Sequence, residues 1–571
     1  MTAVHLSFPD YVVVIGYFVI VVWIGLYFRN QIVAAKDYFA GGHQIPWWLA
    51  GISHYMSSFS AFAFVAYAQL GYTYGWVAVT LFWASAFACM LGGLFFARRW
   101  RRARVITPVE FLERRFNAFV RQLFAWAGIP MKIFDDALKI FATGLFVSLS
   151  MGLSLHWSII LCGVVMIVYT FYGGLWALVV TDYVQFIMKG LAMLLLLPLA
   201  IAGAGGMSRA FSSLPPELFH LTNGPYTWIY IAGFFVLIGI SYNASWALAQ
   251  KYYSVRNEKE ASKAAYCAAA LNFLGAPLLI LPAVIGRHFL PDLVAQNRTA
   301  DVYVLLVLKL LPVGMIGIIV AAMFSATMAV VSSDYNAIAS VLTKDVYQRL
   351  INPKAAEMRL LWMGRWITLG LGALTILLSL WIAVSHQQSL FNTMVTVLGL
   401  FMAPTLLPLL AGLTVRKLNW QGAFGGFLCG LLTGFLMLAL KTWWLPAQPG
   451  GGSQEALYNF EGASLLVNAA MTVVGMVAGT MLTSRKAEAE TRVNEFFVAL
   501  DRPVAASEVP PSGKSGALPV IGASTFGVGI LLTAAGLLSN VLTARVIDSA
   551  FGVFLLAIGV LFLRNHRKSQ S

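Results

Sequence analysis

Long runs of apolar residues alternate along the whole chain with short polar segments that carry most of its charge. Runs of about 18 residues or more are long enough to cross a bilayer, and counting them predicts fifteen membrane helices. They lie near residues 9–28, 46–72, 75–97, 122–151, 155–173, 178–204, 227–250, 264–287, 313–343, 359–384, 388–414, 420–441, 463–483, 520–539 and 546–563. The pattern predicts an all-α integral membrane protein.

Composition and charge support this prediction. Of the 571 residues, 59% are hydrophobic and 11% are charged, which excludes a soluble domain with an ordinary charged surface. The net charge of +15 does not indicate nucleic-acid binding, because the Lys and Arg residues lie in short segments between the apolar runs. That placement is typical of cytoplasmic loops in the plasma membrane. Lipid, a solute and an ion are the partners to expect.

The basic residues also predict the orientation. Arg98 to Arg121, Lys251 to Lys263, Lys344 to Arg359 and the tail after Arg564 all fall in odd-numbered connections, whereas the even-numbered ones have few Lys or Arg. We therefore expect the N-terminus outside and the C-terminus in the cytoplasm. A Pro- and Ser-rich linker, 484–519, separates the last two helices and the basic tail, 520–571, from the main domain, 1–483.

Helices two to six and seven to eleven form two sets of five, 46–204 and 227–414. An odd number of helices per set forces opposite orientations, as in an inverted repeat. Each set begins with a helix that carries small and polar residues at mid-membrane depth, near 53–60 and 239–246. Interrupted helices at corresponding positions predict a binding site at the centre of the membrane. One helix precedes the repeats and four follow them.

Polar groups converge near the two predicted interruptions, and we expect them to bind the solute. The predicted solute-binding residues are Ser57, Ser58, Phe62, Tyr242, Asn243, Asn272 and Asp136. The fourth helix also carries Lys132, Asp135 and Lys139, at spacings of three and four that allow a self-neutralising ladder. Either the ladder is structural, or one of its members faces the cavity and contacts a charged or polyhydroxylated solute.

Asp182 lies within a predicted membrane helix, where a carboxylate needs a compensating partner. Ser332 and Ser333 share one helical face with position 336, and hydroxyl and carboxylate oxygens suit a hard cation. Asp182, Ser332 and Ser333 therefore form a predicted site for a hard alkali cation. A proton carried by Asp182, Asp334 or His54 is the alternative.

Enzymatic activity is not expected. No nucleophile elbow, nucleotide-binding loop or zinc-protease motif occurs in a supporting context. The four cysteines lie in apolar runs without paired spacing, which argues against both a disulfide framework and a zinc site. No organic cofactor is predicted.

Several motifs resemble the sodium/solute symporter family, which includes sodium/glucose, proline and sialic acid transporters. They are DYFAGG at 37–42 with PWW at 46–48, GY at 71–72 with Gly75, YGGLW at 172–176, TD at 181–182, QK at 250–251 ahead of EA at 260–261, and TKDVY at 343–347. The resemblance covers about residues 9 to 480. It implies the leucine-transporter-type fold of five plus five helices with an extra N-terminal helix.

The resemblance also implies a principal sodium site made by the backbone carbonyls of Met56, Phe59 and Ala326 and by two hydroxyl side chains one turn after Ala326. In this chain those two positions are Ala329 and Val330, which offer no oxygen. A second sodium site of some members corresponds to Asp182, Ser332 and Ser333, which are present. The resemblance places the polar residues that bind the sugar in glucose-type members near Phe62, Ala63 and Asn272, and in this chain most of them are replaced.

The function expected from the sequence is sodium-driven uptake of a small polar organic solute, such as a sugar or sugar acid, by alternating access. A proton-coupled symporter is one alternative. The other is a sensor or scaffold that keeps the symporter fold without ion coupling, because Ala329 and Val330 replace the usual hydroxyl ligands.

Overall fold

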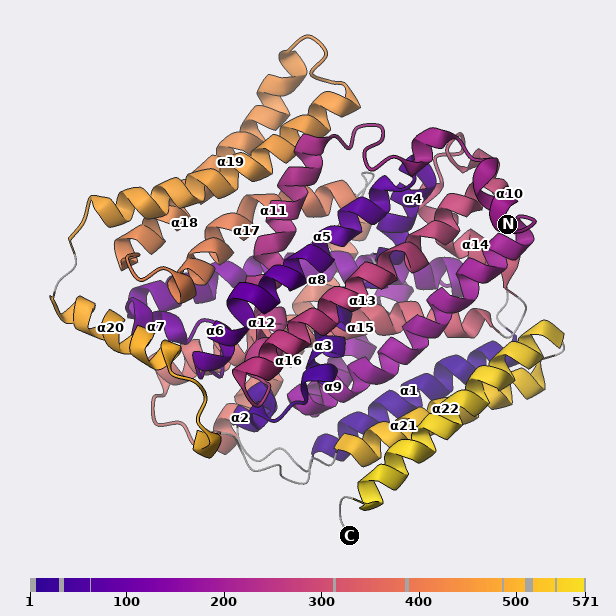
Figure 1. The fold of residues 1–571 in the computed structure, drawn as a ribbon, viewed down its shortest axis with the longest axis horizontal. Helices are drawn as coiled ribbons and strands as arrows, with labels where there is room; N and C mark the ends of the chain where they lie inside the picture. Colours follow the sequence, from indigo (N-terminus) through magenta and orange to yellow (C-terminus); the bar gives the residue numbers. More distant parts are fainter. Residues whose placement is uncertain are drawn as a thin grey trace.

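The computed structural model describes residues 7–29, 35–61, 63–311, 315–385, 390–484, 487–508, 517–539 and 542–568. Within these ranges the chain is helical throughout, and β-structure is confined to two isolated bridges, Ile45 with Val255 and Asn223 with Tyr226. The helices pack side by side in one elongated bundle (Figure 1). The predicted all-α membrane architecture is confirmed.

The long helices follow the predicted apolar runs closely. They are α1 (Phe8–Arg29), α5 (Val77–Leu91), α8 (Ala118–Met151), α9 (Leu155–Gly203), α11 (Trp228–Ala244), α13 (Glu258–Ile285), α15 (Ile316–Val341), α16 (Glu357–Ser385), α17 (Leu390–Thr414), α18 (Trp420–Ala439), α19 (Gln454–Met481), α21 (Ala517–Leu538) and α22 (Leu542–Lys568). The shorter ones are α2 (Ala35–Ala40), α3 (Trp47–Met56), α4 (Ala68–Tyr74), α6 (Ala97–Arg102), α7 (Phe111–Arg115), α10 (Met207–Ser212), α12 (Trp246–Tyr253), α14 (Val302–Leu310) and α20 (Ala487–Asp501).

Eleven helices in the described part of the chain are long and apolar enough to cross a membrane, and the bent pair α11–α12 makes twelve. Three further predicted spans do not meet the same criterion, for different physical reasons. The run 46–72 is divided by an interruption, and α8 carries buried charges. The run 155–173 contributes only a shorter apolar helix, because α9 is kinked at Gly174 with a φ of 55°. The count of fifteen spans stays a prediction.

The first interruption begins slightly later than predicted. Ser57 N still donates to Ser53 O at 2.8 Å, so α3 continues to Met56 before the chain leaves the helix. Helical structure resumes at Ala63, whose amide donates to Ser60 O at 2.9 Å, first as a π-helical segment, Ala63–Tyr67, and then as α4. The amide of Ala61, which has no helical partner, donates instead to the Thr327 hydroxyl of α15 at 2.9 Å. A neighbouring helix thus satisfies the backbone that the interruption exposes.

The second interruption lies within the predicted segment. Ser245 adopts an extended conformation, with φ −56° and ψ 134°, and α11 and α12 meet there at an angle of 50°. The carbonyl of Asn243 accepts a hydrogen bond from the Trp100 indole at 2.9 Å. This side-chain donor replaces a helical partner that the bend removes.

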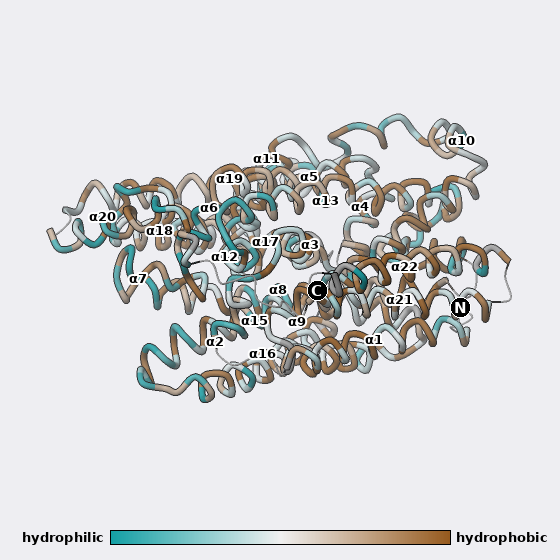
Figure 2. The backbone as a smooth tube through the Cα atoms, turned by 60° about the horizontal axis from the view of Figure 1, so that its bottom comes forward, coloured by the Kyte–Doolittle hydropathy of each residue, from teal (hydrophilic) through white to brown (hydrophobic). Residues whose placement is uncertain are grey.

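Basic and polar segments gather at one end of the bundle, around α2, α6, α7, α12 and α20 (Figures 1 and 2). We call this the basic end. Residues that flank the two interrupted helices are bonded to each other here. Ile45 N donates to Ser254 O at 3.2 Å, the Gln250 side chain donates to Phe39 O at 2.5 Å, and His43 Nδ1 lies 2.7 Å from Tyr253 O. The bundle is closed at this end by contacts that are largely to main-chain atoms.

The segment predicted as a linker contains a helix, α20, which packs against α6 and α7. Its buried residues are Val493, Phe496, Phe497 and Leu500, with Phe497 near the Arg115 guanidinium. Their spacing of three, one and three residues is that of an amphipathic helix, so the signal was present in the sequence.

The last two helices, α21 and α22, pack against each other and α21 lies along α1 (Figure 1). Glycines allow the backbones of α21 and α22 to approach each other closely. A Cβ atom on Gly552 would stand 2.2 Å from the Thr533 hydroxyl and 2.8 Å from Gly529 O. Small residues that let backbones approach are typical of membrane helix pairs.

Candidate functional site

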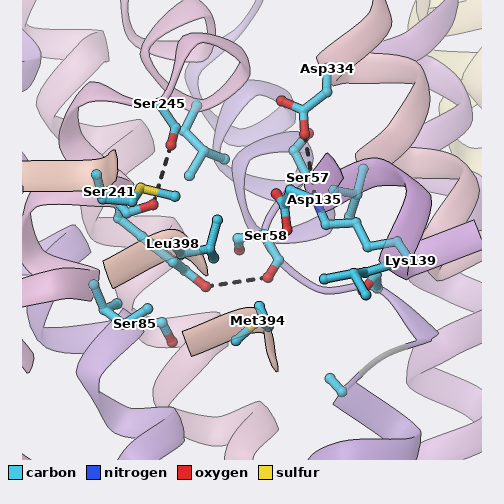
Figure 3. A pocket seen from close by; sticks show the side chains of 18 of the residues that line it. Ser57, Ser58, Ser85, Asp135, Lys139, Ser241, Ser245, Asp334, Met394 and Leu398 are labelled. Atoms are coloured by element: carbon cyan, nitrogen blue, oxygen red, sulfur yellow. Dashed lines mark hydrogen bonds and ion pairs between the residues drawn. The ribbon is translucent and has the colours of Figure 1, made fainter. Parts of the chain in front are cut away.

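A cavity of about 130 Å³ lies between the two interruptions. Segments far apart in the sequence line it: the break after α3, the middle of α8, the end of α11, α15 and α17 (Figure 3). Its lining residues are Ser57, Ser58, Ser60, Ala63, Tyr67, Leu81, Phe82, Ser85, Lys132, Asp135, Leu138, Lys139, Phe234, Ile238, Ser241, Tyr242, Ser245, Leu248, Val330, Asp334, Met394, Leu398 and Met402. The cavity therefore combines hydroxyl, aromatic, aliphatic and charged groups.

One side of the cavity is a cluster of buried charges on α8 and α15, which we call the charged wall. It consists of Lys132, Asp135, Asp136, Lys139 and Asp334. Lys132 Nζ lies 3.0 Å from Asp334 Oδ1, and Lys139 Nζ lies 2.7 Å from Asp135 Oδ2. The ladder predicted within α8 is present and extends to a second helix through Asp334.

The opposite side of the cavity is formed by hydroxyl groups at the two interruptions. The Tyr242 hydroxyl donates to Ser58 O at 3.2 Å and so connects the second interrupted helix to the first. The hydroxyl oxygens of Ser241, in the last turn of α11, and Ser245, at the bend, lie 3.2 Å apart (Figure 3). These groups can exchange their mutual hydrogen bonds for bonds to a polar solute.

The predicted solute-binding residues are found in two layers. Ser57, Ser58 and Tyr242 line the cavity. Asn243, Asn272 and Asp136 are fully buried and do not line it, and Phe62 lies outside the described residues.

The two asparagines have structural partners behind the cavity. Asn243 Nδ2 donates to Ala88 O at 3.0 Å, and the close approach of α5 depends on Gly92, where a Cβ would stand 2.4 Å from Asn243 Oδ1. Asn272 Oδ1 accepts a hydrogen bond from Ser85 at 2.9 Å, and Ser85 itself lines the cavity. Asn272 thus orients a cavity residue.

The Asp182 carboxylate lies deeper in the bundle and is fully buried. Ser53 of α3 donates a hydrogen bond to Asp182 Oδ2, while Asp182 Oδ1 has no hydrogen-bond partner among the described residues. Ser57 donates to the Ser333 hydroxyl at 3.0 Å, which brings the first break and α15 together. The Asp182 oxygen without a described partner and the Ser53 hydroxyl beside the carboxylate are oxygen donors of the kind that suits a monovalent hard cation.

A fixed positive charge is already present near these oxygens. The Lys251 ammonium of α12 donates to the Ser333 hydroxyl at 3.2 Å, and Lys251 and Lys189 both act electrostatically on Asp182. Lys189 Nζ lies over the Tyr55 and Phe59 rings, 3.8 and 3.7 Å from their centroids. A cation at Asp182 would therefore have to compete with Lys251.

The remaining predicted cation ligands are placed as follows. Ser332 donates to Ala329 O at 3.4 Å within its own helix. Met56 O accepts from Phe59 N at 3.3 Å in the first break, and Ala326 is fully buried in α15. Ala329 and Val330 are buried and apolar, so the side chains at these two positions supply no oxygen.

His54 is enclosed by neighbouring side chains. Its ring stacks on Tyr252 with centroids 5.0 Å apart, and Nδ1 lies 3.9 Å from Cys89 Sγ. The imidazole is fully buried and does not line the cavity.

Sequence reasoning missed two parts of the site. Met394, Leu398 and Met402 recur at a spacing of four on α17 and form an apolar side of the cavity, but the same spacing is typical of ordinary helix packing. The sequence predicts Asp334 only as an alternative proton carrier, whereas in the structure its side chain pairs with Lys132 on another helix. No spacing within α15 could have revealed that contact.

Comparisons with known proteins agree with this architecture. The model of the sodium:solute symporter family matches residues 38–430. The sodium/sialic acid symporter NanT of Aliivibrio fischeri is 26% identical over 439 residues, covering 74% of this chain and 86% of NanT. Sodium/glucose cotransporter 4 of Danio rerio is also 26% identical, covering 76% and 72% of the two chains.

Solved structures show the same fold. An outward-open, substrate-bound sodium-coupled sialic acid symporter with a novel sodium site superposes with a TM-score of 0.70 at 22% identity, covering 84% of this chain and 99% of that one. A closed nucleobase-cation-symport-1 transporter superposes with a TM-score of 0.51 at 13% identity, covering 80% and 98%.

Proposed function

The chain belongs to the sodium:solute symporter family, and on that premise we propose that it couples inward sodium movement to uptake of a small polar organic solute. It is a multi-pass membrane transporter with many apolar helices. The observation that carries the proposal is the cavity between the two interrupted helices, lined by hydroxyl groups from both. A site held by two such helices can open alternately to either side of the membrane.

The proposed solute site consists of Ser57, Ser58 and Tyr242 at the cavity, with Asn243, Asn272 and Asp136 behind it and Phe62 near the first break. A sugar, a sugar acid or a similar polar molecule suits the hydroxyl groups. The curated relatives that transport sialic acid or glucose support this solute class.

The proposed sodium site consists of Asp182, Ser332 and Ser333, with the carbonyls of Met56, Phe59 and Ala326 as further ligands. The oxygen without a partner on Asp182 supports it. When bound, sodium would offset the buried carboxylate charge and draw the first break towards α15. No organic cofactor enters the proposal.

The proposed architecture extends the observed fold. The whole chain has fifteen membrane spans, an outside N-terminus and a cytoplasmic C-terminus. Residues 1–483 form the symporter, with inverted five-helix repeats at 46–204 and 227–414. Residues 484–519 are the cytoplasmic connection, and 520–571 form a two-helix appendage with a basic tail.

A second candidate is a symporter driven by protons alone, through Asp182, Asp334 or His54. It is favoured by the apolar Ala329 and Val330 and by the Lys251 ammonium beside Ser333. The apolar residues Ala329 and Val330 would equally favour an uncoupled sensor or scaffold.

Uptake into proteoliposomes separates the candidates. We propose screening radiolabelled solutes, beginning with N-acetylneuraminate and glucose, with an inward sodium gradient and with none at fixed pH. Accumulation that requires sodium supports the proposal. Accumulation that follows a pH gradient without sodium supports the proton-driven alternative, and binding without accumulation under either gradient supports the sensor.

A further inference from the structure

The charged wall contains one more acid than base. Asp135, Asp136 and Asp334 place a carboxylate oxygen each within 4.8 Å of the others, whereas Lys132 and Lys139 are the two bases in ion-pair contact with them in the described chain. All five side chains are at most 13% exposed. With every group ionised, a net charge of −1 would remain inside the membrane.

The two ammonium groups are shared unequally. Lys139 Nζ lies 2.7 Å from Asp135 but 3.4 Å from both Asp136 and Asp334, and Lys132 Nζ lies 3.0 Å from Asp334. Asp135 and Asp334 therefore each have a close ammonium partner. Asp136 has the longest ion-pair distance of the three acids, is fully buried and does not line the cavity. Its Oδ2 has no hydrogen-bond partner among the described residues.

Three carboxylates this close cannot all ionise in a low-dielectric environment, because each repels the other two. A proton on one of them removes the excess charge and supplies a hydrogen-bond donor. We propose that Asp136 binds a proton, so that the protein has a proton-binding site separate from the proposed sodium site at Asp182.

Other charged groups near the wall do not offset the excess. On α8 itself the charged neighbours of Asp136 are Lys132, Asp135 and Lys139, and on α15 the neighbour is Asp334. On α9, Asp182 and Lys189 interact with each other, and Lys251 of α12 contacts Ser333. Lys251 acts mainly on Asp182 and less on Asp334.

A metal ion or an organic cation fits this position less well than a proton. The Lys139 ammonium already lies among the three carboxylates, within 3.4 Å of each. Asp136 does not line the cavity, so a solute in the cavity has no direct contact with it. A proton needs neither coordination space nor an open path of its own size.

The site is linked to the cavity because Asp135 and Asp334 line it. This link to transport rests on the proposed function, whereas proton binding itself does not. A solute group that attracts Lys132 or Lys139 weakens their ion pairs with the acids and so strengthens proton binding at Asp136. A cationic solute group at Asp135 or Asp334 weakens proton binding at Asp136. By thermodynamic reciprocity the proton changes solute affinity by the same factor.

Infrared spectroscopy of the purified full-length protein tests the site without any solute. A protonated carboxyl group has a C=O stretch that is distinct from that of a carboxylate and shifts in deuterated water. We expect at pH 7 a component of this band that is lost in Asp136→Asn and retained in Glu455→Gln, an exposed acid of α19. Absence of the band in the wild type, or an unchanged band in Asp136→Asn, would overturn the proposal.

A matched pair of variants gives a second readout. If Asp136 is protonated in the folded protein, the neutral Asp136→Asn replacement has nearly the wild-type thermal unfolding midpoint at about pH 4 and a higher midpoint at pH 7, because the wild-type carboxyl group must release its proton on unfolding and the midpoint therefore falls as the pH is raised. Asp135→Asn removes the closest partner of Lys139 and lowers the midpoint. Equal destabilisation by both variants, or failure of Asp136→Asn alone to fold, would show that Asp136 is ionised and refute the inference.

Discussion

The Ser53 hydroxyl of α3 donates a hydrogen bond to the Asp182 carboxylate of α9. Ser53 lies one turn before the first interruption, so the buried acid is attached to the helix that carries the cavity hydroxyls Ser57 and Ser58. A change at Asp182 can therefore reach the cavity through a single hydrogen bond and one helical turn. This contact gives the proposed ion site a physical route to the solute site.

Asp182→Asn tests the proposed sodium site. We expect solute affinity in the wild type to rise with sodium concentration at fixed pH, because sodium offsets the buried carboxylate. The amide cannot do so, and the dependence should disappear. Solute binding at several sodium concentrations measures it, with Asp548→Asn as the control that should keep the wild-type dependence. A sodium response that survives in Asp182→Asn would contradict the assignment.

Lys251→Gln should strengthen sodium binding. The Lys251 ammonium lies 3.2 Å from Ser333 Oγ and repels a cation bound there. Removing one nearby positive charge in a partly shielded site changes affinity by about tenfold. The sodium concentration that gives half-maximal solute binding should fall accordingly, whereas Lys259→Gln on α13 should leave it unchanged. Weaker sodium binding in Lys251→Gln would mean that the lysine supports the site rather than competes with the ion.

Ser58→Ala should lower solute affinity, whereas Asn243→Ala should also lower thermal stability. Ser58 lines the cavity, and loss of one hydrogen bond to solute costs up to about 1.5 kcal/mol, or about tenfold in affinity. Asn243 bonds to Ala88 O and Gly239 O, so its loss should lower the thermal unfolding midpoint as well. Equilibrium solute binding and a melting curve on each variant measure the difference. If the double variant bound solute as tightly as the wild type, the proposed placement of the solute would be wrong.

Glu113 connects α7 to the segment after α15 at the basic end. Its carboxylate accepts hydrogen bonds from Arg349 at 2.6 Å and Arg121 at 2.5 Å, and the Arg349 contact is the main reason that its pKa is lowered. A lowered folded-state pKa gives stability that is present above the ordinary glutamate value of about 4.3 and is lost as pH falls through the folded-state pKa.

Glu113→Gln should therefore lower the melting temperature at pH 7, by about 2 °C or less because the group is partly exposed. The difference from the wild type should vanish at about pH 3. Melting curves across this pH range check the sign, and Glu455→Gln, which lies at the other end of the molecule, is the control. A difference that grew on acidification would exclude the ion-pair explanation.

The proposed orientation makes a direct prediction for labelling. In a variant without the four native cysteines, Lys568→Cys should react with a membrane-impermeant thiol reagent only after the cytoplasmic face is exposed, because the basic tail is expected inside. Intact and inverted vesicles provide the comparison. Reaction from the exterior alone would reverse the topology of the whole chain.

The sequence was sufficient for the elements that depend on local pattern. Apolar runs located the long helices, and small polar residues such as Ser57 and Ser245 located both interruptions. The family resemblance was likewise confirmed. The sequence did not predict contacts between distant segments, such as those of Lys132 with Asp334 and of Lys251 with Ser333. Helical spacing defines which residues share a face, but the partner of that face depends on how helices pack.

The closure of the basic end has a consequence for the speed of turnover. Its bonds to Phe39 O, Tyr253 O and Ser254 O join the segment before α3 to the C-terminal end of α12, so we expect them to break together before the cavity opens there. A concerted step of this kind has a large activation enthalpy. We therefore expect transport to slow steeply on cooling, even where the equilibrium affinity for solute changes little, and release at this end to limit the cycle.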